Sequence, residues 1–99
     1  MACINFAAVN AAALSALPSL VRRWLPDGHV AGREYTARNP RRADRHTGSF
    51  RVNMDTGKWA DFATDDRGGD VISLAAFLSG TGQGEAARNL AAMLGVRAE

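Results

Sequence analysis

The chain has 99 residues, enough for one hydrophobic core, and we therefore expect a single domain over residues 1–99. Its composition, 46% hydrophobic and 22% charged, is that of an ordinary globular protein and excludes a disordered or fibrous chain. The formal net charge of +2 is unevenly distributed, because residues 33–51 carry a net charge of +4 and residues 55–70 one of −3. A basic segment of this kind suits phosphate groups or another acidic surface.

We expect residues 1–25 to be an N-terminal helical segment. Apolar side chains recur at helical spacing over residues 4–24, from Ile4 through Leu14 to Trp24, which predicts an amphipathic helix. Pro18 leaves two alternatives, because a proline fits the first turn of a helix but not its interior. The stretch is therefore either one helix or two shorter helices that meet just before Pro18.

The apolar composition of this segment raises the question of whether it is a secretory signal or a membrane span. No basic residue precedes it, and Asn5, Asn10 and Ser15 interrupt it, so we expect neither a cleaved signal nor a membrane partner. The single cysteine, Cys3, excludes an intramolecular disulfide and a zinc site with several cysteines. We expect a cytoplasmic protein, in keeping with this cysteine usage.

The middle of the chain predicts a small antiparallel sheet. Residues 25–32 read as a turn after the helix, and residues 33–39 as a weak strand. Residues 49–54 alternate between apolar and polar side chains, and residues 58–63 return as a partner strand after a tight turn at residues 55–57. The sequence therefore predicts a β-hairpin over residues 49–63.

Two helices are expected after the sheet. Residues 64–70 read as a loop that ends in Asp70, whose carboxylate suits the N-cap of a helix over residues 71–80. A last helix is expected over residues 84–96, where apolar side chains again recur at helical spacing. The predicted fold class is α+β: a small antiparallel sheet, an N-terminal helix and two C-terminal helices.

Three short motifs occur in a fixed order: TGSF before the hairpin, GGDVISLAAFL after it, and GEAARNLAAMLG in the last helix. In this order they resemble the zinc-ribbon domain at the N-terminus of DnaG-type bacterial primases and of related phage and plasmid primase-helicases. The resemblance covers residues 33–95. It fits a stand-alone small protein as well as one domain of a larger primase-helicase.

The chain lacks the metal ligands of the family that it resembles. Counting from the motifs places the four zinc ligands of that family on Pro40, Ala43, Phe62 and Asp65, and none of these is a cysteine or a histidine. We therefore expect a zinc-ribbon-like fold with no metal and no other cofactor. Phe62 is expected to pack against Trp59 or Phe50 in place of the metal, which would contribute about 2–3 kcal/mol.

The resemblance implies a non-catalytic accessory role in DNA replication, and the basic segment points to single-stranded DNA as the partner. No arrangement for acid-base or nucleophilic catalysis is apparent, so we expect no enzyme activity. The alternative is a module that docks a primase, helicase or regulator through its alanine-rich helical face. The candidate nucleic-acid-binding residues are Arg33, Arg38, Arg41, Arg42, Arg45, Arg51, Lys58 and Trp59.

Several of these candidates also have a purely structural interpretation. The arginines can be a solvated loop that pairs with the acidic residues 61–70, and Trp59 can be a core residue rather than a base-stacking platform. The aspartates of that acidic stretch suggest a magnesium site, but Asp70 is more simply a helix cap and Asp65 and Asp66 a solvated turn.

Overall fold

The computed structural model describes residues 3–41 and 49–99 and has the expected α+β class. Its sheet has five strands in the order β1-β2-β3-β4-β5, and every neighbouring pair is antiparallel. The described elements are α1 (Phe6–Ser15), α2 (Leu17–Trp24), β1 (His29–Ala31), β2 (Glu34–Ala37), β3 (Phe50–Asn53), β4 (Trp59–Asp61), β5 (Asp66–Gly68), α3 (Val71–Ser79) and α4 (Gln83–Leu94).

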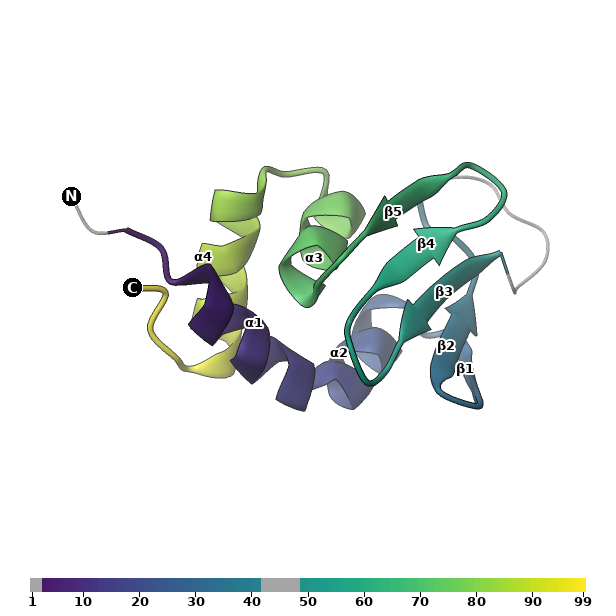
Figure 1. The fold of residues 1–99 in the computed structure, drawn as a ribbon, viewed down its shortest axis with the longest axis horizontal. Coiled ribbons are helices and arrows are strands. Elements are labelled where there is room, and N and C mark those ends of the chain that lie inside the picture. The colour runs from purple at the N-terminus through teal and green to yellow at the C-terminus, as the bar shows by residue number, and fades with distance from the viewer. Residues whose placement is uncertain (1–2, 42–48) are drawn as a thin grey trace.

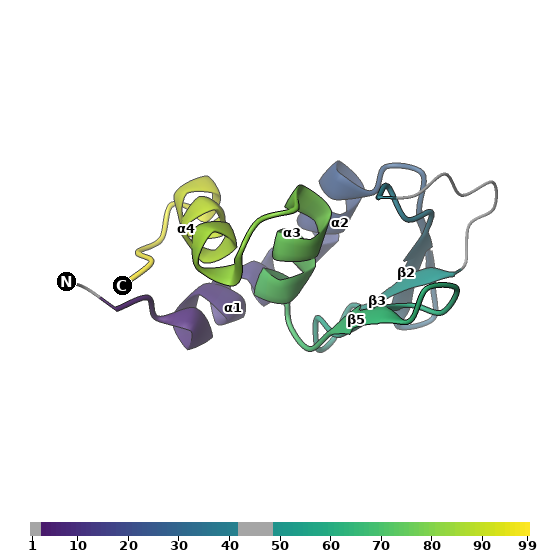
Figure 2. The same ribbon diagram turned by 90° about the horizontal axis from the view of Figure 1, so that it is seen from above.

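The sheet lies at one end of an elongated molecule that measures 44 × 23 × 19 Å (Figure 1). Helices α2 and α3 lie over one face of the sheet, which is the inner face (Figure 2). Helices α1 and α4 form the opposite end, where both termini are found, and the Asn5 amide donates to the Ala98 carbonyl over 2.7 Å. The helices therefore leave the other face of the sheet, the outer face, uncovered among the described residues.

The N-terminal segment is divided into two helices, as one of the two alternatives predicted. Helix α1 ends at Ser15 and α2 begins at Leu17, with Pro18 in the first turn of α2. In that turn the backbone N–H groups have no partner within the helix, so the missing N–H of proline costs nothing. Pro18 thus starts α2 rather than bending a continuous helix.

The β3–β4 hairpin confirms the prediction for the middle of the chain. Val52 of β3 pairs with Trp59 of β4 on one side and with Tyr35 of β2 on the other. Gly57 in the turn has φ +79°, and a Cβ there would lie 2.9 Å from the Val71 side chain. Both the backbone conformation and the close approach of α3 therefore require glycine at this position.

Strands β1 and β5 were not expected from the sequence. Both have three residues and lie at the edges of the sheet, and their segments were interpreted as a turn (25–32) and a loop (64–70). Their side chains show no apolar alternation, because Asp66, Arg67 and all three residues of β1 are exposed. Backbone pairing with a neighbouring strand, rather than side-chain burial, makes these segments strands.

An aromatic cluster joins the sheet to α3. The rings of Phe50 and Trp59 are 5.7 Å apart, and that of Phe77 lies 6.0 Å from Phe50 and 4.7 Å from Trp59. Phe50 is fully buried and Trp59 is 5% exposed, and the Trp59 Nε1–H donates to the Ser73 hydroxyl over 2.9 Å. The indole thus buries its apolar body and satisfies its one polar group.

Asp70 is the N-cap of α3, as predicted. Its carboxylate accepts from the Ser73 amide over 2.8 Å, and the Ser73 hydroxyl completes a capping box. We expect Asp70→Ala to lower the free energy of unfolding by about 1–2 kcal/mol, because the first turn of α3 loses its acceptor. Urea unfolding measures the change, and Asp27→Ala, at an exposed position in a turn, is the control. An unchanged unfolding midpoint for Asp70→Ala would contradict this role.

Candidate nucleic-acid interface

The outer face of the sheet carries exposed basic side chains. The strand register places Arg51 of β3 opposite Thr36 of β2 and opposite Ala60 of β4, which in turn pairs with Arg67 of β5. Because paired residues project from the same side of a sheet, these side chains form one row across the outer face. Lys58 extends the row, since it lines a shallow depression of about 180 Å³ together with Arg51.

Two of the candidate arginines make ion pairs at the surface. Arg51 lies 3.8 Å from Glu34, and their side chains are 44% and 39% exposed. Arg33, in the turn between β1 and β2, lies 3.6 Å from Asp55 in a still more exposed pair. Solvent-exposed pairs of this kind contribute about 0–1 kcal/mol to stability.

Phe62 is not in the core, and the prediction that it replaces the metal by packing is wrong. It is 69% exposed, the most exposed of the large apolar side chains among the described residues. The alternation of β4 explains this, because Trp59 and Asp61 point inward and Ala60 and Phe62 therefore point outward. On the outer face the Arg51 guanidinium carbon lies 5.3 Å from the centre of the Phe62 ring.

The same alternation corrects the candidate role of Trp59. Its ring is enclosed by the aromatic cluster, so it cannot stack with a base, and its inclusion among the binding residues is wrong. In the sequence, the alternation of residues 59–62 is the signal that distinguishes the buried Trp59 from the exposed Phe62.

A buried polar network joins the ends of β2 and β4. Asp61 is fully buried, and its carboxylate accepts from the Asn39 side-chain amide and from the Ala63 backbone amide, each over 2.8 Å. The Asn39 carbonyl oxygen accepts from the Arg41 amide, also over 2.8 Å. This network holds the segment that follows β2 against the turn that presents Phe62.

Three of the four positions counted as zinc ligands, Pro40, Phe62 and Asp65, lie within the described residues. Phe62 and Asp65 are exposed, and Asp65 has a φ of +66°, whereas Pro40 lies beside the helices. Ala43 is outside the described residues. Within residues 3–41 and 49–99 no group of three or more histidine, cysteine, aspartate or glutamate side chains is placed to hold a metal ion.

The remaining candidate arginines that the structure describes, Arg38 and Arg41, lie on different surfaces of the molecule. Arg38 is exposed directly after β2. Arg41 turns toward the end of α3, where its guanidinium carbon lies 5.9 Å from the Phe77 ring centre and close to Gly80. It therefore lies apart from the outer face. Arg42 and Arg45 fall outside the described residues.

The acidic stretch is less exposed than its sequence indicates. Asp61 is buried in the network described above, and Asp70 caps α3. The exposed aspartates of this stretch are Asp55, Asp65 and Asp66. Two of the five aspartates counted over residues 55–70 therefore have structural roles.

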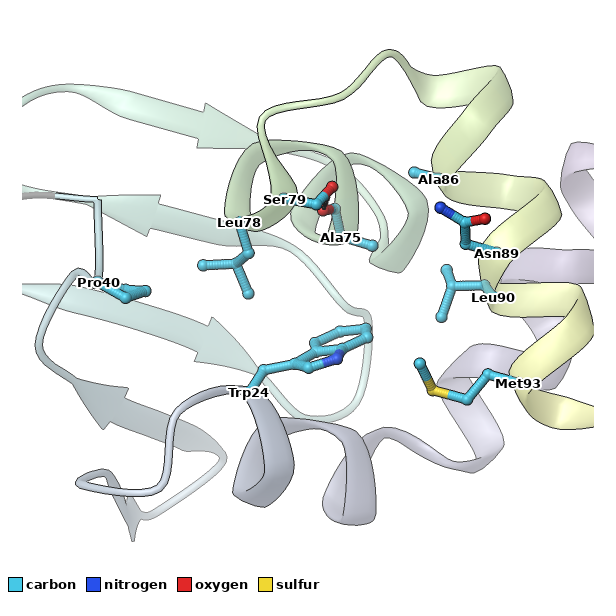
Figure 3. A pocket seen from close by; sticks show the side chains of 9 residues that line it. All are labelled: Trp24, Pro40, Ala75, Leu78, Ser79, Ala86, Asn89, Leu90 and Met93. Carbon is cyan, nitrogen blue, oxygen red and sulfur yellow. Dashed lines mark hydrogen bonds between the residues drawn. The ribbon is translucent and has the colours of Figure 1, made fainter.

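A second feature lies among the helices, away from the outer face. An open pocket of about 380 Å³ is formed where α2, α3 and α4 meet, and the Trp24 indole extends across it toward Met93 (Figure 3). Met93 is 44% exposed. Most of the side chains that line the pocket are apolar. The lining residues are Trp24, Pro40, Ala75, Leu78, Ser79, Ala86, Asn89, Leu90 and Met93.

No family model, curated protein or solved structure matches the chain. None of the helices in the described part of the chain is long and apolar enough to cross a membrane.

Proposed function

We propose that this chain is a non-catalytic, cytoplasmic accessory domain of a primase or replication protein, of phage, plasmid or mobile-element type, that binds single-stranded DNA. The observation that carries the proposal is the row of exposed cations on the outer face of the sheet, where Arg51, Lys58 and Arg67 lie apart from the helices. Arg38 lies beside this row at the end of β2.

The physical argument rests on the phosphate backbone. A flexible single strand can follow a line of cations across a flat sheet, and each phosphate that pairs with a cation releases condensed counterions. Affinity for such a surface falls steeply as salt is added, independently of base sequence. In the family that the motifs resemble, the polymerising chemistry belongs to a separate domain, which agrees with a purely binding role for this chain.

We expect the triple variant Arg51→Gln, Lys58→Gln and Arg67→Gln to bind single-stranded DNA more weakly and with a shallower salt dependence. Each lost phosphate contact removes about 0.7 from the slope of log affinity against log salt concentration, so three lost contacts remove about 2. Fluorescence anisotropy with a labelled oligothymidine, titrated at several salt concentrations, measures both quantities.

The matched control loses the same charge from the helical side. Arg22 and Arg23 of α2 and Arg88 of α4 are exposed, and their replacement by glutamine changes the net charge equally. We expect this control to keep most of the affinity and of the salt slope. Equal losses for both triple variants would show that net charge, rather than the outer face, determines binding and would overturn this assignment.

A module that docks a primase, helicase or regulator is the second candidate function. It is favoured by the pocket among the helices, whose apolar walls include the half-buried Trp24 and the exposed Met93. In that case the basic residues affect only solubility. Absence of DNA binding at low salt, together with a loss of partner binding on Met93→Glu, supports this alternative.

A further inference from the structure

We propose that Phe62 is a stacking platform for one unpaired base, and that it makes the outer face selective for single strands over duplex DNA. This inference rests on the proposed function, because it assigns a residue to the same surface. It follows from four observations: the exposure of the Phe62 ring, the cation beside it, the cations on the same face, and the burial of the nearby aromatic side chain, Trp59 of β4.

The exposure of Phe62 is unusual for its position. A phenylalanine left in water forgoes about 2 kcal/mol of burial, and the inner face holds Phe50 and Trp59 instead. Ala60, its outward neighbour on β4, is small, and the surface beside the ring is therefore a shallow depression rather than a filled one. A flat apolar ring at the edge of an open depression provides the surface that a base requires.

The Arg51 guanidinium lies over the Phe62 ring in a cation–π contact, with its central carbon 5.3 Å from the ring centre. Glu34, 3.8 Å from Arg51, helps to hold that guanidinium in place. Only one side of the ring meets Arg51, and the 69% exposure shows that much of the rest is open. A base can therefore stack on the open side while Arg51 pairs with an adjacent phosphate.

Selectivity for unpaired bases follows from this geometry. In a duplex each base is already stacked and paired, so reaching the ring would require unstacking it, whereas a single strand offers its bases freely. The surrounding cations Lys58 and Arg67 do not discriminate in this way, because both forms of DNA carry phosphates. Phe62 is thus the residue that discriminates between single-stranded and duplex DNA.

The decisive comparison uses two labelled oligonucleotides of equal length, about 15 residues, one of thymidine and one of abasic sites with the same phosphates. For the unmodified chain we expect the thymidine strand to bind about 5- to 150-fold more tightly, the range that one stacked base supplies. Phe62→Leu should remove most of this preference and leave the affinity for the abasic strand unchanged. Phe62→Trp should keep the preference and show quenched fluorescence on binding.

Phe6→Leu, at an exposed position on α1, is the matched control and should keep the full preference. If the unmodified chain binds the two strands equally, or if Phe62→Leu keeps the preference, the role of Phe62 is overturned while DNA binding by the cations stands. If the unmodified chain binds neither strand at low salt, the proposed function fails, and the stacking role with it.

Discussion

Replacing Asp61 by asparagine is expected to lower the free energy of unfolding by about 3 kcal/mol. Among the described residues, the fully buried carboxylate accepts hydrogen bonds from the Asn39 side-chain amide and from the Ala63 amide. An asparagine of the same shape presents an NH2 group to one of these donors whichever way it is turned, so one buried N–H loses its acceptor. Urea unfolding measures the change, and Asp66→Asn, at an exposed position, is the control.

A charge swap distinguishes this hydrogen-bond network from a general effect of the mutation. In the double variant Asn39→Asp and Asp61→Asn, the new aspartate accepts from the Arg41 amide and from the new asparagine, whose carbonyl oxygen accepts from Ala63. Each of these hydrogen bonds is therefore satisfied again. We expect the double variant to recover most of the stability lost by Asp61→Asn, and a double variant less stable than Asp61→Asn would contradict the network as described.

Truncation of Trp59 and truncation of Phe62 are expected to change the free energy of unfolding by very different amounts. Trp59→Ala should cost about 3–5 kcal/mol, because it empties the space beside Phe50 and Phe77 and removes the hydrogen bond that the indole donates to the Ser73 hydroxyl. Phe62→Ala should change the free energy of unfolding by no more than about 0.5 kcal/mol, because the side chain is 69% exposed.

Thermal and urea unfolding of both variants measure this contrast, and far-UV circular dichroism shows whether Trp59→Ala still folds. If Trp59→Ala is too unstable to study, Trp59→Phe keeps most of the packing and removes only the hydrogen bond to Ser73. A large loss of stability for Phe62→Ala would place Phe62 in the core after all. It would also remove the basis for its assignment to DNA binding.

The buried network also bears on the resemblance to primase zinc ribbons. The counted ligand positions Pro40 and Phe62 directly follow Asn39 and Asp61, and these two side chains, rather than the counted positions, meet in the interior. They join the ends of β2 and β4, the two segments on which the first and second ligand pairs were counted. A polar cross-link, rather than the predicted packing of Phe62, therefore joins these two segments.

Much of the fold could be predicted from local patterns. The β3–β4 hairpin, the Asp70 cap and the two C-terminal helices follow from alternation, turn chemistry and helical spacing, which act over a few neighbouring residues. The edge strands β1 and β5 could not be predicted in this way. Their pairing depends on the backbone of a neighbouring strand, and their own side chains carry no apolar pattern.

The α+β class, the uneven charge and the arginines and lysine around the hairpin follow from local patterns in the chain. Which of these side chains share a surface depends on the tertiary fold: Arg51, Lys58 and Arg67 lie on the outer face, whereas Arg41 turns to α3. The same fold placed Trp59 in the core and Phe62 on the outer face. The physical reason is that a strand has two faces, and only the position of α3 against the sheet determines which of them is buried.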